Sequence, residues 1–308
     1  MTAEEKIQEL KSLIKTTLTP LIDNDFLLLE VPYYTNIGDT LIWQGEMDFL
    51  RQFDYKCKGM YSSGTFHFPS INPNEIILFQ GGGNFGDLWS VPHDFKMKVM
   101  AEYPDNRFVF FPQTVYFQHK QNLLSCAEFM SHYNATICAR DNISFAILKE
   151  YFKNEIVLVP DMAFYMDRSN WKIPQNKGED LFLLRGDVEL KQYEEFKHIA
   201  SQNKILVSDW RFPREFNWQL KGHTQMRRHF LFLYDWYART IFRPFMVKSG
   251  IQFIASHNKI YSTRLHAAIL TILLGKACDL TWFDNSYGKN SSFYETWLKD
   301  VADIRFIK

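Results

Sequence analysis

The spacing of apolar residues over positions 2–18 predicts an amphipathic helix. Apolar side chains recur there at helical spacing, which places them along one stripe of the helix. They are Ile7, Leu10, Leu13, Ile14 and Leu18. Thr2 is placed to cap this helix and Pro20 to stop it. We therefore expect one face of the helix to pack on a domain rather than to enter a membrane.

Short apolar runs further along the chain predict buried strands. Helical patterns lie between most of them, and this alternation is typical of a parallel sheet covered by helices on both faces. The first series of runs covers 26–32, 76–80, 107–112, 135–139 and 156–160, and the second covers 180–185, 204–208, 258–262 and 277–283.

A polar stretch with Pro and Gly, residues 167–180, separates the two series and indicates a domain boundary. We expect residues 1–166 and 180–285 to form two Rossmann-like α/β domains that face one central cleft. Residues 286–308 are expected to form a C-terminal loop and helix that packs back on the first domain.

Composition and charge narrow the class of protein. With 308 residues, 46% hydrophobic, the chain can bury two cores of ordinary size. Lys plus Arg and Asp plus Glu both total 35, so the overall charge indicates no nucleic-acid partner, and any anion site must be built locally.

The cysteines and the apolar segments indicate a cytoplasmic protein. The four cysteines form no CxxC pair, which favours thiols in a reducing compartment and no metal site. The first residues have no basic head followed by an apolar body, so they do not resemble a secretory signal. The longest apolar stretch, 265–275, is too short to span a bilayer.

Polar residues follow several of the predicted strands, where open parallel sheets bind their ligands. Asn36 and Asp39 follow the first strand, Arg140 follows a later one, and Asp161 stands at another strand end. Asp141 can cap the helix after Arg140. We expect these groups to converge on one edge.

The stretch "YSTRLHAAILTILLG" places two cations at the start of a predicted helix. Thr263 can cap this helix, and Arg264, Leu265 and His266 occupy its first turn. Cations are disfavoured there, because the helix dipole is positive at the N-terminus, so an anionic ligand would explain them. The alternative is that Arg264 pairs with a core carboxylate and His266 hydrogen-bonds a neighbouring loop.

The stretch "QGGGNFGDLW" fits neither the dinucleotide fingerprint nor the P-loop. Gly82 and Gly83 allow the backbone to approach a ligand closely or to turn sharply. Asn84 and Asp87 can bind hydroxyl groups, and Trp89 offers a flat apolar face for a sugar ring. We interpret this stretch as a wall of a substrate site.

Residues 212–250 are rich in aromatics and arginines. We expect a long helix packed on the second domain. A second interpretation is a peripheral surface that contacts a membrane or a lipid-linked substrate.

Eight motifs together resemble the polysaccharide pyruvyl transferase family, whose enzymes move pyruvate from phosphoenolpyruvate onto sugars of capsular, exopolysaccharide or cell-wall glycans. They run in order along nearly the whole chain as "NIGDTLIWQGE", "FQGGGNFGDLW", "FFPQTVYF", "ARDNISFAIL", "LVPDMAF", "FLLRGDVE", "STRLHAAIL" and "DNSYGKNSSFYETW". The resemblance implies a two-domain fold of the GT-B glycosyltransferase type. The first domain would then carry the acceptor side.

The resemblance also implies a site for phosphoenolpyruvate. Its residues would be Arg140, Arg264, Leu265, His266, Lys289 and, as an addition, His93. Family members often have Asp and Gly where this chain has Thr263 and Ala267.

The chemistry of the donor agrees with these residue types. Phosphoenolpyruvate is a dianion or more, and arginine forks suit both its phosphate and its carboxylate. Arg185 is a reserve candidate. His266 suits the role of proton donor, and Asp39 or Asp161 that of the base. No step requires a metal or a cofactor.

Two other functions remain open at this point. A nucleotide-sugar glycosyltransferase could share the architecture, since fold does not fix function. A non-catalytic glycan-binding protein of the same fold would bind sugar without turnover.

Overall fold

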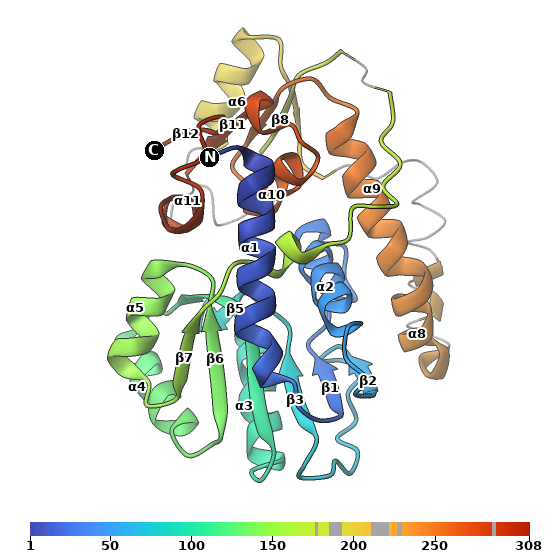
Figure 1. The fold of residues 1–308 in the computed structure, drawn as a ribbon, viewed down its shortest axis with the longest axis vertical. Helices are drawn as coiled ribbons and strands as arrows, with labels where there is room; N and C mark the ends of the chain where they lie inside the picture. Colours follow the sequence, from blue (N-terminus) through green and yellow to red (C-terminus); the bar gives the residue numbers. More distant parts are fainter. Residues whose placement is uncertain (176–177, 185–192, 211–221, 224, 227–229, 285–287) are drawn as a thin grey trace. The chain divides into compact units, whose positions relative to one another are not determined.

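The computed structural model describes residues 1–308 except 176–177, 185–192, 211–221, 224, 227–229 and 285–287 (Figure 1). It is a mixed α/β fold with two parallel sheets, which confirms the predicted class. The chain divides into two compact units. Unit 1 contains residues 1–9, 35–41 and 167–308, and unit 2 contains residues 10–34 and 42–166.

Unit 2 holds a sheet of seven parallel strands. Their order is β2-β1-β3-β5-β6-β7, and β4 pairs with β5 beside this path. The strands are β1 (Phe26–Leu29), β2 (Cys57–Tyr61), β3 (Ile76–Phe79), β4 (Gly82–Gly86), β5 (Arg107–Tyr116), β6 (Ala135–Ala139) and β7 (Glu155–Leu158). The helices are α2 (Ile37–Leu50), which begins in unit 1, α3 (Ser90–Glu102), α4 (Lys120–Met130) and α5 (Asn142–Tyr151), with 3-10 turns at Thr19–Leu21 and Met162–Tyr165.

Helices cover both faces of this sheet. Phe79, Phe108 and Phe110 pack in one cluster with apolar side chains of α3, α4 and α5. On the opposite face, Phe111 meets Phe49 of α2 with ring centroids 6.3 Å apart. Two covered faces explain why β1 and β3 consist entirely of apolar residues.

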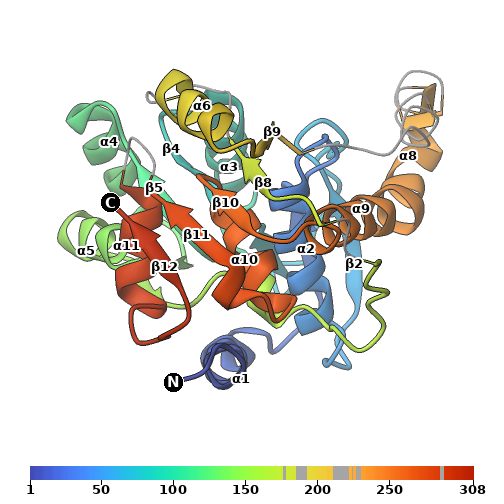
Figure 2. The ribbon, with the colours of Figure 1, turned by 90° about the horizontal axis from the view of Figure 1, so that it is seen from above.

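Unit 1 holds a smaller parallel sheet, whose strands lie in the order β12-β11-β10-β8-β9 (Figure 2). The strands are β8 (Leu181–Leu183), β9 (Leu206–Ser208), β10 (Ile260–Ser262), β11 (Leu280–Phe283) and β12 (Arg305–Ile307). The helices are α6 (Tyr193–Gln202), α8 (Leu231–Tyr237), α9 (Arg243–Ala255), α10 (Leu265–Leu273) and α11 (Lys289–Trp297), with a π-helical turn at Ala238–Phe242 and a 3-10 turn at Ala277–Asp279.

Aromatic rings pack on both faces of the unit 1 sheet. Phe182 contacts Phe196 of α6 with ring centroids 5.6 Å apart, and Phe283 contacts Phe182 on the same face at 5.3 Å. Trp282 contacts Phe293 of α11 at 6.4 Å. The neighbouring residues Trp282 and Phe283 thus pack against helices on opposite sides of the sheet.

The first helix, α1 (Ala3–Leu18), agrees with the sequence prediction. Thr2 and Glu5 form a capping box, in which each backbone N–H donates to the other side chain, at 2.8 Å and 3.2 Å. Lys6 pairs with Asp300 at 2.9 Å, and Glu4 pairs with Arg168 at 2.6 Å. The predicted apolar stripe is buried except for Leu13, which is half-buried.

Three strands differ from expectation. The apolar pattern predicted neither β2, nor β4, nor β12, which extends the second sheet from within the expected C-terminal loop. Within 212–250 the described part is helical from Leu231 onward, through α8, the π turn and α9. No helix in the described ranges has the length and apolar character needed to cross a bilayer.

Candidate functional site

Three candidate cations lie where helices begin at the carboxyl edge of the unit 1 sheet. Arg264 is the N-cap residue of α10, His266 lies in its first turn, and Lys289 is the first residue of α11. These helices follow β10 and β11, which are neighbours in the sheet. Because the helix dipole disfavours cations there, the arrangement suits an anionic ligand.

The cap of α10 differs from the sequence prediction. Helix α10 begins only at Leu265, so Arg264 and not Thr263 holds the N-cap position. The buried Ser262 hydroxyl orders this turn, because its Oγ accepts the N–H of Arg264 at 2.9 Å and donates to the carbonyl of Arg264 at 3.1 Å. The prediction that Thr263 caps the helix was therefore wrong.

Among the described residues, the Arg264 guanidinium pairs with the acid Asp209, while its Nε–H has no acceptor. Its Nη2 donates to Asp209, which directly follows β9 and whose side chain is 44% exposed. Its Nε is buried and has no hydrogen-bond partner among the described residues. Arg264 thus pairs with a carboxylate, as the alternative interpretation of the sequence proposed, but this carboxylate does not lie in the core. Since a buried N–H without an acceptor is costly, a bound anion would stabilise this group.

His266 lies against the start of α2. A Cβ at Gly38 would come within 2.7 Å of its Nδ1, so the close approach of ring and backbone requires glycine. Asn36 orders the same turn, because its Oδ1 accepts the Gly38 N–H at 2.9 Å and its Nδ2 donates to Asp39 at 2.7 Å. The structure therefore brings Asn36 and Asp39 together with each other and with the segment that supports His266.

The start of α11 is tied to the loop that carries Arg264. The buried Asn290 amide donates to the carbonyls of Thr263 at 2.9 Å and of Phe283 at 2.8 Å. Gly288, at φ 65°, provides the left-handed turn before Lys289. Asn290 was not predicted, although an asparagine directly after a strand–turn pattern was a signal for such a link. Arg185 lies outside the described residues.

Arg140 of unit 2 is buried and paired. It directly follows β6 and is 3% exposed. Its Nη1 donates to Asp161 and its Nε to Thr114, both at 2.7 Å. The sequence placed Arg140 and Asp161 at one edge, as observed, but gave them separate roles. Asp141 caps α5 as predicted, accepting the Ser144 N–H at 2.9 Å.

The glycine stretch forms a strand rather than a loop. Strand β4 runs parallel to β5, with Gly82 opposite Gln113 and Gly86 opposite Tyr116. Gly82 and Gly86 have φ values of 130° and 128°, and a Cβ at Gly86 would overlap the carbonyl of Tyr116 at 1.8 Å. These glycines therefore allow two backbones to run closely side by side.

Asp87 ends this stretch as a structural acceptor. Its carboxylate accepts from the backbone N–H groups of Gln118 at 2.5 Å and His119 at 3.1 Å, and from the Asn122 side chain at 2.8 Å. Burial raises the pKa of Asp87, but these hydrogen bonds outweigh it, and the net pKa lies below the usual value.

We expect Asp87→Ala to cost about 1–3 kcal/mol of stability, because it leaves several donors without an acceptor. The contribution of Asp87 should be present near neutral pH and lost as the pH falls through its lowered pKa. Denaturant titrations of Asp87→Ala and of the exposed Asp105→Ala, at pH 7 and at an acid pH below the lowered pKa of Asp87, measure it. Normal stability with weakened acceptor binding would instead assign Asp87 to the substrate.

The remaining candidates of unit 2 lie around the start of α3. Trp89 is its N-cap residue and is 40% exposed, while Asn84 and Gly83 are half-buried. His93, in its first turn, stacks edge-on against Phe117 at 6.1 Å. Burial, followed by the charge of nearby Lys96, lowers the pKa of His93, so it favours the neutral form.

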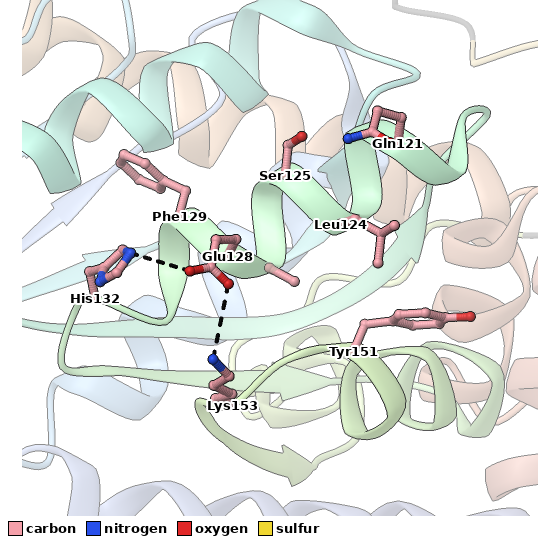
Figure 3. A pocket seen from close by; sticks show the side chains of 9 residues that line it. Gln121, Leu124, Ser125, Glu128, Phe129, His132, Tyr151 and Lys153 are labelled. Carbon is pink, nitrogen blue, oxygen red and sulfur yellow. Dashed lines mark ion pairs between the residues drawn. The ribbon is translucent and has the colours of Figure 1, made fainter.

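A pocket of about 710 Å³ lies apart from these residues, between α4 and α5 (Figure 3). Glu128 points toward His132 and Lys153 there, at 3.6 Å and 4.0 Å. It contains none of the candidate residues. Across the described ranges, no group of three or more His, Cys, Asp or Glu side chains is arranged to hold a metal ion.

Comparison with a model of the family described as polysaccharide pyruvyl transferase finds a match over residues 36–278. A Bacillus subtilis protein named "Putative pyruvyl transferase EpsO" is 31% identical over 312 residues, which cover 96% of this chain and 94% of that protein. "Pyruvyl transferase 1" of Schizosaccharomyces pombe is 26% identical and covers 88% of this chain and 69% of that protein.

A crystal structure of a functionally uncharacterized Klebsiella pneumoniae protein resembles this fold. Its TM-score is 0.67 at 19% identity, over 97% of this chain and 98% of that one. At this identity the likeness concerns the fold alone.

Proposed function

Since the chain belongs to the polysaccharide pyruvyl transferase family, we propose that it transfers pyruvate from phosphoenolpyruvate to a glycan precursor, forming a ketal. The acceptor is a sugar of a capsular, exopolysaccharide or cell-wall glycan. The observation that carries this proposal is the group of cations at the helix starts of unit 1, with the Arg264 Nε–H lacking an acceptor in the described structure.

The donor fits this group by charge and shape. Phosphoenolpyruvate carries a phosphate and a carboxylate, both of which accept two parallel hydrogen bonds from an arginine fork. Arg264 supplies such a fork, Lys289 a further cation, and the start of α10 the positive end of a helix dipole. Leu265 is the first residue of that helix.

The reaction needs one proton donor and one base. His266 protonates the methylene carbon, which becomes the ketal methyl group, and a sugar hydroxyl attacks the central carbon. The bond between this central carbon and the phosphate oxygen breaks, and inorganic phosphate leaves. A second hydroxyl of the sugar then attacks the same carbon and closes the ketal ring. Of the two hydroxyl protons released, one replaces the proton of His266 and the other leaves with phosphate or solvent.

The two candidate bases, Asp39 and Asp161, differ in their exposure to solvent. Asp39 is half-buried at the start of α2, whereas Asp161 is 1% exposed and paired with Arg140. This difference supports Asp39. In the proposal Arg140 binds the donor while remaining paired with Asp161, Asn84 and Trp89 bind the acceptor, and no metal or cofactor participates.

The direct test is incubation with phosphoenolpyruvate and a panel of lipid-linked and synthetic glycosides. We expect an acceptor whose mass increases by one pyruvyl group, together with released phosphate. Release of a nucleoside diphosphate from a nucleotide sugar would assign the glycosyltransferase alternative. Binding of sugar without turnover from either donor would assign the glycan-binding alternative.

The proposal further includes a GT-B-like arrangement of the two domains around a central cleft, and a cytoplasmic location at the inner face of the membrane. A crystal structure with phosphoenolpyruvate bound would test the first, and cell fractionation the second.

A lipid-linked acceptor would bring the protein to a membrane surface, and α8 presents apolar residues for it. Phe230, Leu233 and Trp236 recur at helical spacing and are 47%, 38% and 51% exposed. Arg239 and Arg243 follow along the same helical run. Exposed aromatics next to arginines are typical of helices that lie on anionic membranes. Arg227 and Arg228 lie outside the described residues.

We expect weak flotation with anionic liposomes that disappears as salt rises from about 0.1 M to about 1 M, where charges are screened within roughly 3 Å. Leu233→Ala and Trp236→Ala should reduce it. The exposed Ile199→Ala of α6 is the matched control. No flotation at low salt would remove the membrane contact from the proposal.

A further inference from the structure

Glu46 is a buried carboxyl group to which the proposed reaction assigns no role. It lies in α2 and is 0% exposed. Its Oε1 accepts the backbone N–H of Gly81 at 2.8 Å, and its Oε2 has no hydrogen-bond partner among the described residues. No Lys, Arg or His of the described chain lies within ion-pair distance of it.

The charges around Glu46 do not balance an ionised carboxylate. The acids that act on it are Asp161, which caps the 3-10 turn after β7, and Glu30, which directly follows β1. Each already has its own cation, since Asp161 pairs with Arg140 and Glu30 with Lys96. Burial raises the pKa of Glu46 well above the usual value; the Gly81 N–H opposes this, and the two acids add to it. Burial and the two neighbouring acids therefore both favour the neutral form of the Glu46 carboxyl group.

The backbone held by Glu46 is the short break between β3 and the glycine strand β4, two parallel strands that follow each other along β5. Gln113 of β5 donates its Nε2 to the carbonyl of Gln80 at 2.7 Å, and Glu46 accepts from the next residue, Gly81. A Cβ at Gly81 would lie 2.8 Å from the carbonyl of Pro112, so this break is packed tightly against β5. Two buried side chains thus fix consecutive residues between the two strands.

We propose that Glu46 is a positioning residue for the glycan acceptor: through the N–H of Gly81 it fixes the strand Gly82–Gly86 and the Asn84 side chain presented there. This inference rests on the proposed function, because it assigns the acceptor to that strand. It needs only the neutral form of Glu46, whose carbonyl oxygen accepts from Gly81.

The test compares a neutral isostere with a variant that lacks the acceptor oxygen. Glu46→Gln keeps an acceptor for Gly81 and carries no charge, so its KM for the acceptor should stay within about twofold of the parent protein. Glu46→Leu keeps the volume but leaves the Gly81 N–H unpaired, and its acceptor KM should rise about tenfold. The KM for phosphoenolpyruvate should change in neither variant. A purely structural role would not separate the two KM values.

A second measurement needs no turnover. Amide hydrogen exchange at 81–86 should be unchanged in Glu46→Gln and faster in Glu46→Leu, whereas exchange in β10 should stay the same. Because the folded-state pKa of Glu46 is raised, its neutral form stabilises the fold at low pH, and this contribution is lost as the pH rises toward that pKa. The stability of Glu46→Gln relative to the parent protein should therefore increase as the pH rises above the usual pKa of a glutamate.

Three results would overturn the inference. They are equal damage in Glu46→Gln and Glu46→Leu, a matching rise of both KM values in Glu46→Leu, and unchanged exchange at 81–86 in Glu46→Leu. If the parent protein itself fails to transfer pyruvate, the proposed function fails, while the exchange and pH data still decide whether Glu46 fixes the segment between β3 and β4.

Discussion

Replacing His266 by Gln should lower turnover by about 100-fold or more while donor binding is largely retained, as expected for loss of a general acid. Gln occupies a similar volume beside Gly38 and can hydrogen-bond, but it cannot deliver a proton to carbon. Phosphate-release rates and calorimetric titration with phosphoenolpyruvate separate the two quantities. The exposed His198→Gln of α6 is the matched control. A His266→Gln protein with ordinary turnover would exclude the assigned mechanism.

Gly38→Ala provides an independent variant at the same place. The added methyl group would come within 2.7 Å of Nδ1, so the imidazole must move while staying present. Turnover should fall with little change in donor affinity, because the proton donor is misplaced rather than lost. Normal turnover in this variant would show that the position of His266 does not limit the reaction.

Replacing Arg264 should mainly weaken donor binding. Loss of hydrogen bonds to a charged group should raise the dissociation constant of phosphoenolpyruvate roughly 10- to 100-fold in Arg264→Ala. Arg264→Lys should restore little, because an ammonium group lacks the two-pronged geometry and has no counterpart of the buried Nε–H. Calorimetric titration measures the dissociation constant of phosphoenolpyruvate in each variant, and Arg51→Ala, at an exposed arginine, is the control.

Arg140 offers an informative comparison. Its guanidinium is paired with the buried Asp161, so Arg140→Ala should cost about 3–5 kcal/mol of stability by leaving that carboxylate alone. If Arg140→Ala lowers both the stability and the affinity for phosphoenolpyruvate, the result would support the donor role of Arg140. Loss of stability with unchanged affinity of the folded fraction would assign Arg140 to structure. Lowered stability with normal affinity in Arg264→Ala would remove Arg264 from the donor site.

The strongest strand predictions, β1 and β3, concern strands that are buried on both faces. The runs around Phe26 and Ile76 are apolar at every position because helices cover both sides of the sheet. Strand β2 is an edge strand with exposed residues at its start, so its composition carries no such signal. Strand β4 was hidden because glycine favours turns, whereas here Gly86 admits a neighbouring backbone.

The candidate site was predictable by residue type but not by pairing. Parallel strands bring their carboxyl ends to one edge, so Arg140 and Asp161 could be placed together, yet their ion pair depends on side-chain reach that spacing does not contain. The pairing of Arg264 with Asp209 depends on the order of β10, β8 and β9, which the sequence did not reveal. Glu46 looked like an ordinary helical residue, because nothing local shows that its position is buried.

The division of the chain into units has a consequence for protein synthesis. Every residue of unit 2 has been made once position 166 is reached, whereas the segments 1–9 and 35–41 belong with 167–308. Glu4 can form its ion pair only after Arg168 has been translated, and Lys6 only after Asp300 has been translated. The first turns of α1 therefore emerge from the ribosome long before their partners, and closing such long loops slows folding. Unit 2 should mature first on the ribosome, and unit 1 should form after it, together with first turns of α1 that were translated before unit 2.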